Sequence, residues 1–283
     1  MQIFREKTPL REALSALKDK DKSIGFVPTM GALHLGHLSL VKQASSLCDI
    51  VVVSIFINPT QFDNPKDLEN YPRTLENDIT LLKNLELNLI VFTPNAYELY
   101  GNKVKAEEFI FDGLENEMEG KYRTGHFNGV GTVVKKLFEV VEPDKAFFGE
   151  KDYQQLQIIK KLTEKYNLPV EIIGCPIDRE INGLARSSRN ERLSAEVRKE
   201  AAFIYDTLKK VKEKFGTNSA KSINQWVKEQ FEEHPVLKLE YFEIADVVSL
   251  KTINEKKVGE QYRAFIAAFA GDVRLIDNIA LNN

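Results

Sequence analysis

Short, almost continuously apolar runs alternate along the first part of the chain with segments whose apolar residues recur at helical spacing. The apolar runs are rich in β-branched residues, which predicts strands that are covered on both faces. They lie at 23–29, 49–58, 87–94, 144–150 and 170–177, and the helical patterns between them lie at 37–47, 74–85, 129–141 and 152–166. This alternation predicts an α/β, doubly wound parallel sheet of Rossmann-like type, whose ligands bind beyond the carboxyl ends of the strands.

The pattern changes near Pro176, which is followed by a polar loop, DREINGLARSSRNERLS. Two amphipathic helices are predicted next, at Ala195–Phe215 and Ser222–Glu233, and then two strands at 237–246 and 262–270 without a clear crossover helix between them. We therefore expect a Rossmann-like domain over residues 1–177 and a smaller α+β C-terminal domain over residues 178–283.

The overall charge and hydropathy argue against two kinds of partner. The 283 residues carry a net charge of −3, so we expect no general nucleic-acid surface. The longest apolar run, IVVVSIFI (50–57), is too short to span a bilayer, and the charged N-terminal stretch lacks the apolar centre of a signal peptide. Cys48 and Cys175 are far apart and have no partners at metal-binding spacing. We expect a cytoplasmic protein with no membrane partner and two buried thiols.

Unusual polar residues follow each predicted strand end, and His34 and His37 are the most informative of them. They stand three residues apart around Gly36, on one face of the first turn of a predicted helix. The unbonded N–H groups and the positive end of such a turn favour a phosphate, and Gly36 would let a base or ribose approach. Two surface histidines near a helix start explain the spacing alone equally well.

Cationic and hydroxyl side chains that suit phosphate oxygens occur at two further strand ends. Lys151 follows the strand at 144–150, and Ser187, Ser188 and Arg189 lie in the polar loop after the next strand. A solvated surface explains any one of them alone. Arg179, Arg192 and Arg198 are predicted to be surface or salt-bridge residues.

Neutral amides indicate a different ligand. Asn58, Gln61 and Gln155 could orient a small polar substrate without adding charge. An arginine clamp would over-stabilise a carboxylate that must act as a nucleophile, and amides avoid that penalty. Gln155 also fits an ordinary helix start. His126 is equally compatible with a substrate donor and a helix-start residue.

Six ordered segments together resemble one known family. PTMGALHLGH, FINPTQF, YPRTLENDI, GHFNGV, FFGEKDYQQL and GLARSSRN are similar to the pantothenate synthetase (pantoate–β-alanine ligase) family. The resemblance covers about residues 24–193. HxGH alone would indicate only the wider superfamily of HIGH-motif nucleotidyltransferases. The resemblance implies a ligase that adenylates (R)-pantoate with ATP and then joins the pantoyl group to β-alanine, releasing pyrophosphate and AMP.

The resemblance also implies site residues. The catalytic set is His37, His34 and Lys151, with His37 as proton donor. The ATP-binding set is Met30, Gly31, Ala32, Leu33, His34, Leu35, Gly36, His37, Gly149, Glu150, Lys151, Asp152, Asp178, Arg186, Ser187, Ser188 and Arg189. The substrate-binding set is Gln61, Gln155, Asn58 and His126.

By the same resemblance, ATP is a substrate, Mg²⁺ is required, the enzyme is a homodimer, and the C-terminal domain closes over the nucleotide. No metal ligands are assigned. Three positions depart from the family's usual residues. Leu35 stands where the family commonly has an acidic residue, Arg186 where it commonly has Met or Leu, and Asp178 where it commonly has an apolar residue. We expect an altered ATP affinity and unchanged chemistry.

Three other functions are compatible with parts of this pattern. An adenylyltransferase acting on a phosphate ester would need additional basic residues, whereas the amides favour a carboxylate substrate. A class I tRNA synthetase would need a longer chain with an RNA-binding appendage. A non-catalytic nucleotide-binding module would have lost phosphate contacts, yet His34, His37, Lys151 and Arg189 are all present.

Overall fold

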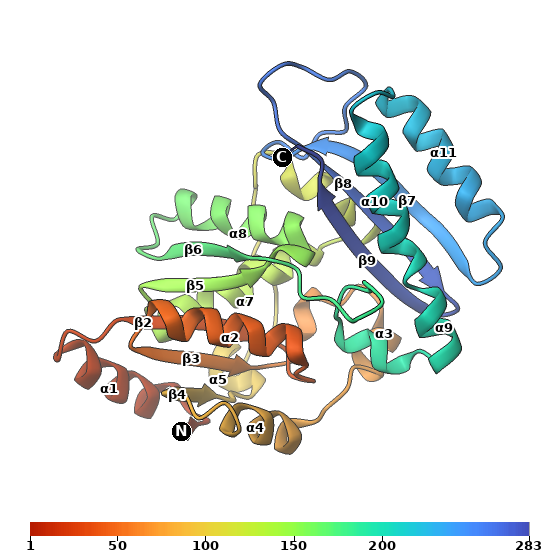
Figure 1. Cartoon of the computed structure of the whole chain (residues 1–283). Helices are drawn as coiled ribbons and strands as arrows, with labels where there is room; N and C mark the ends of the chain where they lie inside the picture. The colour runs from red at the N-terminus through yellow and green to blue at the C-terminus, as the bar shows by residue number, and fades with distance from the viewer. Residues whose placement is uncertain (283) are drawn as a thin grey trace. The chain divides into compact units, whose positions relative to one another are not determined.

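The computed structural model describes residues 1–282, which form two compact units (Figure 1). Unit 1 comprises Met1–Glu115, Glu119–Glu150 and Gln155–Pro176, and unit 2 comprises Asn116–Met118, Lys151–Gln154 and the chain from Ile177 onward. Two short segments from the first part of the sequence thus belong to unit 2, which the hydrophobic pattern did not indicate. Among the described residues, no helix is both long and apolar enough to cross a membrane.

Unit 1 is built on a six-stranded parallel sheet with the order β1-β4-β3-β2-β5-β6. Its strands are β1 (Gln2–Phe4), β2 (Ile24–Thr29), β3 (Ile50–Ile55), β4 (Leu89–Phe92), β5 (Lys145–Gly149) and β6 (Glu171–Cys175). Five of them lie within the predicted apolar runs. The edge strand β1 was not predicted because its three residues are too few to show a periodicity.

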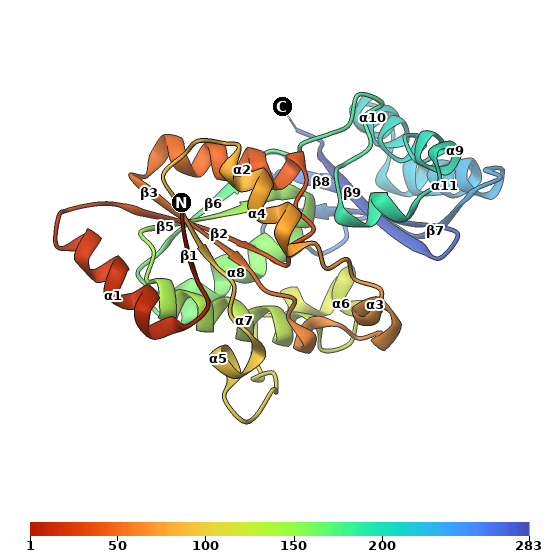
Figure 2. The same ribbon diagram turned by 90° about the horizontal axis from the view of Figure 1, so that it is seen from below.

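Helices cover both faces of this sheet, as predicted. In Figure 2, α2 (Leu35–Leu47) and α4 (Leu75–Lys83) lie on one face, and α1 (Lys7–Lys18), α7 (His126–Val141) and α8 (Tyr153–Lys165) lie on the other. Shorter helices in the connections are α3 (Pro65–Glu69), α5 (Ala96–Tyr100) and α6 (Glu119–Tyr122), with the single 3₁₀ turns η1 (Pro59–Gln61), η2 (Leu114–Asn116) and η3 (Glu150–Asp152). One apolar core lies between α2 and the strands, including Val27, Val53, Val91 and Phe147, none of which is exposed. The predicted α/β doubly wound fold is confirmed.

Unit 2 contains a three-stranded antiparallel sheet, β7 (Leu237–Asp246), β8 (Tyr262–Ala270) and β9 (Val273–Ala280), which pair in that order. The helices are α9 (Ala195–Glu200), α10 (Phe203–Phe215) and α11 (Ala220–Glu232), and η4 (Ser188–Arg192) precedes them. The single helix expected at 195–215 is thus two helices, separated by a turn at 201–202. The strand β9 was missed because Arg274, Asp277 and Asn278 break its apolar pattern.

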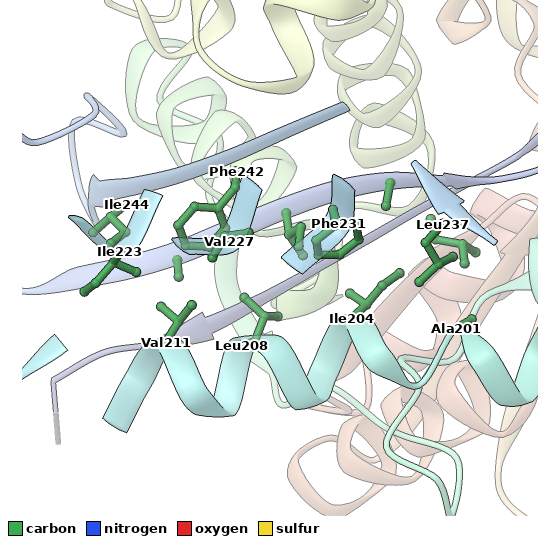
Figure 3. Close-up of a cluster of buried hydrophobic side chains, with 14 of the residues drawn as sticks. Ala201, Ile204, Leu208, Val211, Ile223, Val227, Phe231, Leu237, Phe242 and Ile244 are labelled. Carbon is green, nitrogen blue, oxygen red and sulfur yellow. The ribbon is translucent and has the colours of Figure 1, made fainter. Parts of the chain in front are cut away.

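The core of unit 2 lies between its helices and one face of its sheet. Figure 3 shows Leu208 and Val211 of α10 directed toward Val227 of α11 and Ile244 of β7. All four side chains are almost completely buried. Alternate residues of β8 and β9 join this core, so one face of the small sheet is covered by helices.

His234 follows α11 and is held in its neutral form by the backbone. Its Nδ1 accepts hydrogen bonds from the backbone N–H groups of Val236 (3.2 Å) and Leu237 (3.0 Å). Its ring centroid lies 4.5 Å from that of Phe203. Burial lowers the pKa of this imidazole, and Glu200 opposes the shift only in part. A proton on Nδ1 would remove the acceptor that both N–H groups use.

We therefore expect acid to destabilise unit 2 through His234. Since the folded-state pKa lies below the unfolded value, this contribution is present above about pH 6.5 and is lost as the pH falls through the folded-state pKa. His234→Asn keeps an acceptor without a titrating ring. The melting temperature of the wild type should fall more steeply than that of the variant between about pH 7.5 and 5.5. Parallel profiles would rule out this role.

Candidate active site

His34 and His37 lie at the start of α2 and cap it with their own rings. His34 Nδ1 accepts from the Gly36 N–H at 3.1 Å, and His37 Nδ1 accepts from the His34 N–H at 3.3 Å. The two ring centroids are 4.1 Å apart. Because a backbone N–H can only donate, both Nδ1 atoms must be unprotonated. In the neutral rings, the proton therefore lies on Nε2, and each histidine has an Nε2–H donor.

The loop before α2 is held by a carboxylate that the sequence reasoning did not assign. Asp78, on α4, accepts from the N–H groups of Ala32 (2.9 Å) and Leu33 (2.8 Å), and from the Thr74 hydroxyl. The Asp78 side chain is buried, and Ala32 has a positive φ of 49°. An acidic residue on the buried face of a predicted helix was the available signal, within the segment YPRTLENDI.

These contacts change the expected mode of phosphate binding. The sequence predicted unbonded N–H groups at this helix start, but the N–H groups of Ala32, Leu33 and Gly36 are already bonded to Asp78 and His34. The N–H groups at this helix start are therefore largely satisfied by the protein itself. Any phosphate near α2 is best met by the imidazole Nε2–H groups rather than by the backbone.

Asn58 and Gln61 form a second cluster, at the carboxyl end of β3. Asn58 Nδ2 donates to Gln61 Oε1 at 3.0 Å, and Gln61 Nε2 lies 3.1 Å from Met30 Sδ. The Tyr100 hydroxyl donates to Asn58 Oδ1 at 2.5 Å, and burial raises the pKa of this phenol, so it stays protonated at neutral pH. Since Met30 directly follows β2, the loop of the two histidines and the amide cluster lie at adjacent strand ends, as predicted.

His126 lies in the first turn of α7 and connects to Gln61 through the backbone. Its Nδ1 lies 2.8 Å from the Gln61 carbonyl oxygen, and its Nε2 lies 3.1 Å from Arg123 Nη1. A carbonyl can only accept and a guanidinium can only donate, so Nδ1 carries the proton and Nε2 accepts. Glu119 and Asp63 lie at 3.5 and 3.7 Å from Arg123. Arg123 and Glu119 were not among the residues that the sequence singled out.

Gly129 lets α7 approach the Gln61 segment closely. A Cβ at this position would lie 2.2 Å from the Thr60 carbonyl oxygen and 2.6 Å from Gln61 Cα, which are backbone atoms. The Gly129 carbonyl also accepts from Asn58 Nδ2 at 3.1 Å. The second glycine of GHFNGVG is therefore needed for the position of Gln61.

We expect Gly129→Ala to displace the Gln61 segment. The overpacking should lower the free energy of unfolding by about 1–3 kcal/mol. It should also raise the KM for the expected substrate pantoate at least about tenfold, because a small misplacement of a substrate-holding group is costly. Gly216→Ala is the matched control, since Gly216 has helical backbone angles and nothing within 4 Å of its Cβ position. A wild-type pantoate KM in Gly129→Ala would refute the role of this close approach.

The end of β5 carries further predicted residues of unit 1. Gly149 ends the strand, Glu150 begins η3, and Gln155 is half-buried in the first turn of α8. The neighbouring Gln154, which was not assigned to a ligand, is buried and donates to the Glu117 carbonyl at 2.7 Å within unit 2.

Lys151 and Asp152 belong to unit 2. Lys151 Nζ lies 3.6 Å from Asp152 Oδ2, and the lysine side chain is 19% exposed. The Lys151 carbonyl accepts from Asn278 Nδ2 at 2.9 Å. The backbone of this lysine is thereby attached to β9, which comes from the far end of the sequence.

In the polar loop of unit 2, Asp178 and Arg186 contact each other; they are two of the three residues that are unusual for the family. Arg186 Nε lies 2.7 Å from Asp178 Oδ2, and the Arg186 N–H donates to the Asp178 carbonyl at 3.1 Å. The two positions that were expected to depart from the family's usual residues therefore form one ion pair. The third unusual residue, Leu35, is exposed at the start of α2.

The serines and Arg189 lie in and before η4. The Ser187 hydroxyl accepts from the Arg189 N–H at 3.3 Å and caps η4, and Ser188 is buried. Asn190 Nδ2 donates to the Ala185 carbonyl at 3.1 Å and to Glu180 Oε1 at 2.9 Å.

Glu180 is also the partner of Arg198. Burial alone would raise the pKa of the Glu180 carboxyl, and hydrogen bonds from Arg198 and Asn190 hold that pKa below its usual value. Arg179, Arg192 and Arg198, which were predicted to be surface or salt-bridge residues, form ion pairs with Asp277, Asp272 and Glu180.

Neither a resident metal site nor a disulfide is evident in the described part of the chain. No group of three His, Cys, Asp or Glu side chains is arranged there to hold a metal ion. Cys48 and Cys175 are buried free thiols, as expected, and burial raises the pKa of Cys175 to about 11.

The parallel sheet, the paired histidines at a helix start and the amides at the next strand end are the arrangement expected from the resemblance to HIGH-motif nucleotidyltransferases. The model of the pantoate-beta-alanine ligase family matches residues 2–280. The chain belongs to this family.

The chain is similar to related sequences and to solved structures over nearly the full length of each. The chain is 64% identical to a pantothenate synthetase of Christiangramia forsetii, covering 100% of both chains, and 52% identical to one of Flavobacterium psychrophilum, covering 99% of this chain and 100% of that one. A pantothenate synthetase structure from Thermus thermophilus matches with a TM-score of 0.92 at 38% identity, covering 100% of both chains. A pantoate-beta-alanine ligase from Francisella tularensis, complexed with beta-gamma ATP and beta-alanine, matches with a TM-score of 0.81 at 37% identity, covering 100% of this chain and 98% of that one.

Proposed function

We propose that the chain ligates (R)-pantoate and β-alanine to pantothenate at the expense of ATP, through a pantoyl adenylate. Its family and its full-length relatives support this reaction. The observation that carries it is the pair of histidines, His34 and His37, whose Nδ1 atoms cap the start of α2. Met30, in the loop before them, contacts the neutral amide of Gln61, which is hydrogen-bonded to Asn58. Phosphate donors and an uncharged holder for a carboxylate substrate are what the adenylation of pantoate requires.

In the first step, a pantoate carboxylate oxygen attacks the α-phosphorus of ATP, and the bond to the bridging oxygen of pyrophosphate breaks. We assign the Nε2–H groups of His34 and His37, with the Lys151 ammonium, to the negative charge that develops on the phosphates. His37 is the proton donor in this assignment. Gln61, Asn58 and Gln155 orient pantoate through amide groups that leave its carboxylate nucleophilic, and His126 supports the Gln61 segment.

In the second step, the β-alanine amine attacks the acyl carbon of the adenylate, an amide bond forms and AMP leaves. Adenylation has replaced oxide, a poor leaving group, with AMP. No covalent bond to the protein is required. The ATP-binding assignment extends to 30–37, 149–152, Asp178 and 186–189, and the ion pair of Asp178 with Arg186 supports a fixed backbone at this last segment.

Mg²⁺ is assigned to the nucleotide. Enzymes that use ATP commonly bind Mg²⁺ through the substrate phosphates and water rather than through a cage of protein ligands. The described residues fit that mode, since they offer single carboxylates such as Asp152. When bound, the ion balances charge on the triphosphate and on the departing pyrophosphate.

We further propose a homodimer that acts in the cytoplasm, with the C-terminal domain from residue 178 closing over ATP. These proposals rest on the family resemblance. Sedimentation equilibrium tests the dimer, and cell fractionation tests the location.

Product analysis tests the reaction itself. Purified protein with pantoate, β-alanine and MgATP should form pantothenate, AMP and pyrophosphate in equal amounts. Omission of either organic substrate should abolish pantothenate. ADP and inorganic phosphate as the products of ATP would contradict an adenylate route, since they would indicate an acyl phosphate.

A further inference from the structure

Two adjacent buried polar residues of β9, Asp277 and Asn278, are not used by the mechanism above. Both side chains are almost completely buried, at 4% and 1% exposure. Successive residues of a strand point to opposite faces of a sheet, so the two side chains reach different surroundings. All the contacts described below lie within unit 2.

Asn278 holds the segment that carries Lys151. It lies opposite Phe265 of β8, and its Oδ1 accepts from Arg263 while its Nδ2 donates to the Lys151 carbonyl at 2.9 Å. The Arg263 guanidinium lies 4.1 Å from the ring centroid of Tyr153, two residues after Lys151. The guanidinium can only donate and the carbonyl can only accept, so the orientation of the Asn278 amide is fixed.

Asp277 holds the base of the polar loop on the helix-covered face. Its Oδ2 accepts from Arg179 Nη1 at 2.6 Å and its Oδ1 from Arg179 Nη2 at 3.0 Å. Arg179 Nη1 also donates to the Gly183 carbonyl at 3.0 Å, and the guanidinium lies 3.7 Å from the ring centroid of Tyr205. Such a two-bonded fork fixes direction as well as distance.

Arg179 and Gly183 lie on the two sides of a tight turn that leads directly to Arg186. Arg179 bridges Ala185 through the backbone, and Gly183 has a φ of +92°. A Cβ on Gly183 would lie 2.5 Å from the Tyr205 ring. The position of Asp277 therefore determines where the segment 186–189 begins.

We propose that Asp277 and Asn278 are positioning residues for ATP, which fix the Lys151 segment and the loop leading to 186–189 from opposite faces of one strand. This inference rests on the proposed ATP-binding roles of those two segments. Neither residue is assigned a contact with the substrate. One short strand thereby sets the spacing between an ammonium group and a serine–arginine segment that come from distant parts of the sequence.

Asn278→Asp tests the first anchor with little change in shape. The new carboxylate still accepts from Arg263, so the pairing of β8 with β9 should persist. An oxygen would now face the Lys151 carbonyl in place of the donating amide. Asn224→Asp is the matched control, because Asn224 Nδ2 donates to the Ala220 carbonyl at 3.0 Å within α11.

We expect Asn278→Asp to lower kcat/KM for ATP at least about tenfold while the KM for pantoate stays within about twofold. The melting temperature should match that of Asn224→Asp, and the thermal shift induced by MgATP should shrink. A loss that falls equally on both substrates, or that follows a lowered melting temperature, would show a merely structural role and overturn the proposal. Wild-type kinetics for ATP would also overturn it.

Arg179→Lys tests the second anchor. Lysine keeps a positive charge beside Asp277 but cannot bind both the carboxylate and the Gly183 carbonyl with a planar fork. The same selective loss for ATP is expected, and unchanged ATP kinetics would remove Asp277 from the proposal. If wild-type protein showed no MgATP-induced thermal shift, the proposed function itself would fail. If instead the wild type showed the shift and the variants showed the same shift and the same ATP kinetics, only the positioning role of Asp277 and Asn278 would fail.

Discussion

Replacement of His37 by Asn should leave the protein folded and lower the rate of pantoyl adenylate formation at least about 10²-fold. Asn Oδ1 can take the place of Nδ1 and accept from the His34 N–H, so the start of α2 keeps its cap. The Nε2–H donor has no counterpart in Asn. Loss of one donor or acid that acts in the transition state costs about 10²–10³ in rate. Single-turnover measurement of pyrophosphate release gives this rate directly.

His37→Gln is the matched variant for that experiment. The Gln amide can place an N–H group near the position of Nε2, so part of the lost rate should return without a titratable group. The two variants thus separate the capping role of Nδ1 from the proposed catalytic role of Nε2. Full activity in folded His37→Asn would remove His37 from the chemistry.

Gln61→Glu should weaken pantoate binding strongly at neutral pH and leave ATP binding almost unchanged. The new carboxylate can still accept from Asn58 Nδ2, so the position of the side chain should be preserved. In the proposed site it would face a substrate that is itself a carboxylate. Two such charges about 4 Å apart repel by roughly 4 kcal/mol at an effective dielectric near 20, before salt and relaxation reduce the value. The loss of amide donation adds to this penalty.

Isothermal titration separates these effects from turnover. Pantoate affinity should fall at least about tenfold after screening, and mild acid should restore part of it by protonating the new carboxyl group. Gln43→Glu, at a half-buried position of α2, is a control for the added charge. Normal pantoate affinity in folded Gln61→Glu would exclude Gln61 from the substrate site.

The hydrophobic pattern predicted most of the fold because the central strands of a doubly wound sheet are buried on both faces. Runs such as 49–58 then have few polar positions, and their type is unambiguous. The hydrophobic pattern failed where buried residues are polar and where a helix is interrupted by a short turn. β9 contains Asp277 and Asn278, whose partners lie far away in the sequence, and the turn at 201–202 depends on packing that no helical period records.

The site could be predicted only as a set of residues, without their supports. His34 and His37 were visible from their spacing, but their role as caps of α2 depends on ring orientation. Asp78 and Arg123 were missed because an acidic residue on a helix and a basic residue in a turn are commonplace in sequence. The contact of Asp78 with the 32–33 backbone is tertiary. Arg123 and His126 are only three residues apart, but their contact depends on side-chain orientation, which the sequence does not record.

The unusual residues at 178 and 186 illustrate the same limit of sequence reasoning. Considered singly, each suggested a changed ATP affinity. The structure pairs them with each other, 2.7 Å apart, so the charge that each adds is balanced locally. A spacing of eight residues across a polar loop carries no signal for such a pair.

Exchange of labelled pyrophosphate into ATP tests the adenylate route most directly. With protein, MgATP, labelled pyrophosphate and pantoate, and without β-alanine, label should enter ATP, because pantoyl adenylate forms reversibly and pyrophosphate attacks it. Without pantoate, no label should enter. Exchange that required a phosphorylated acceptor in place of pantoate, or that was absent until β-alanine was added, would contradict adenylation of the pantoate carboxylate as a separate first step.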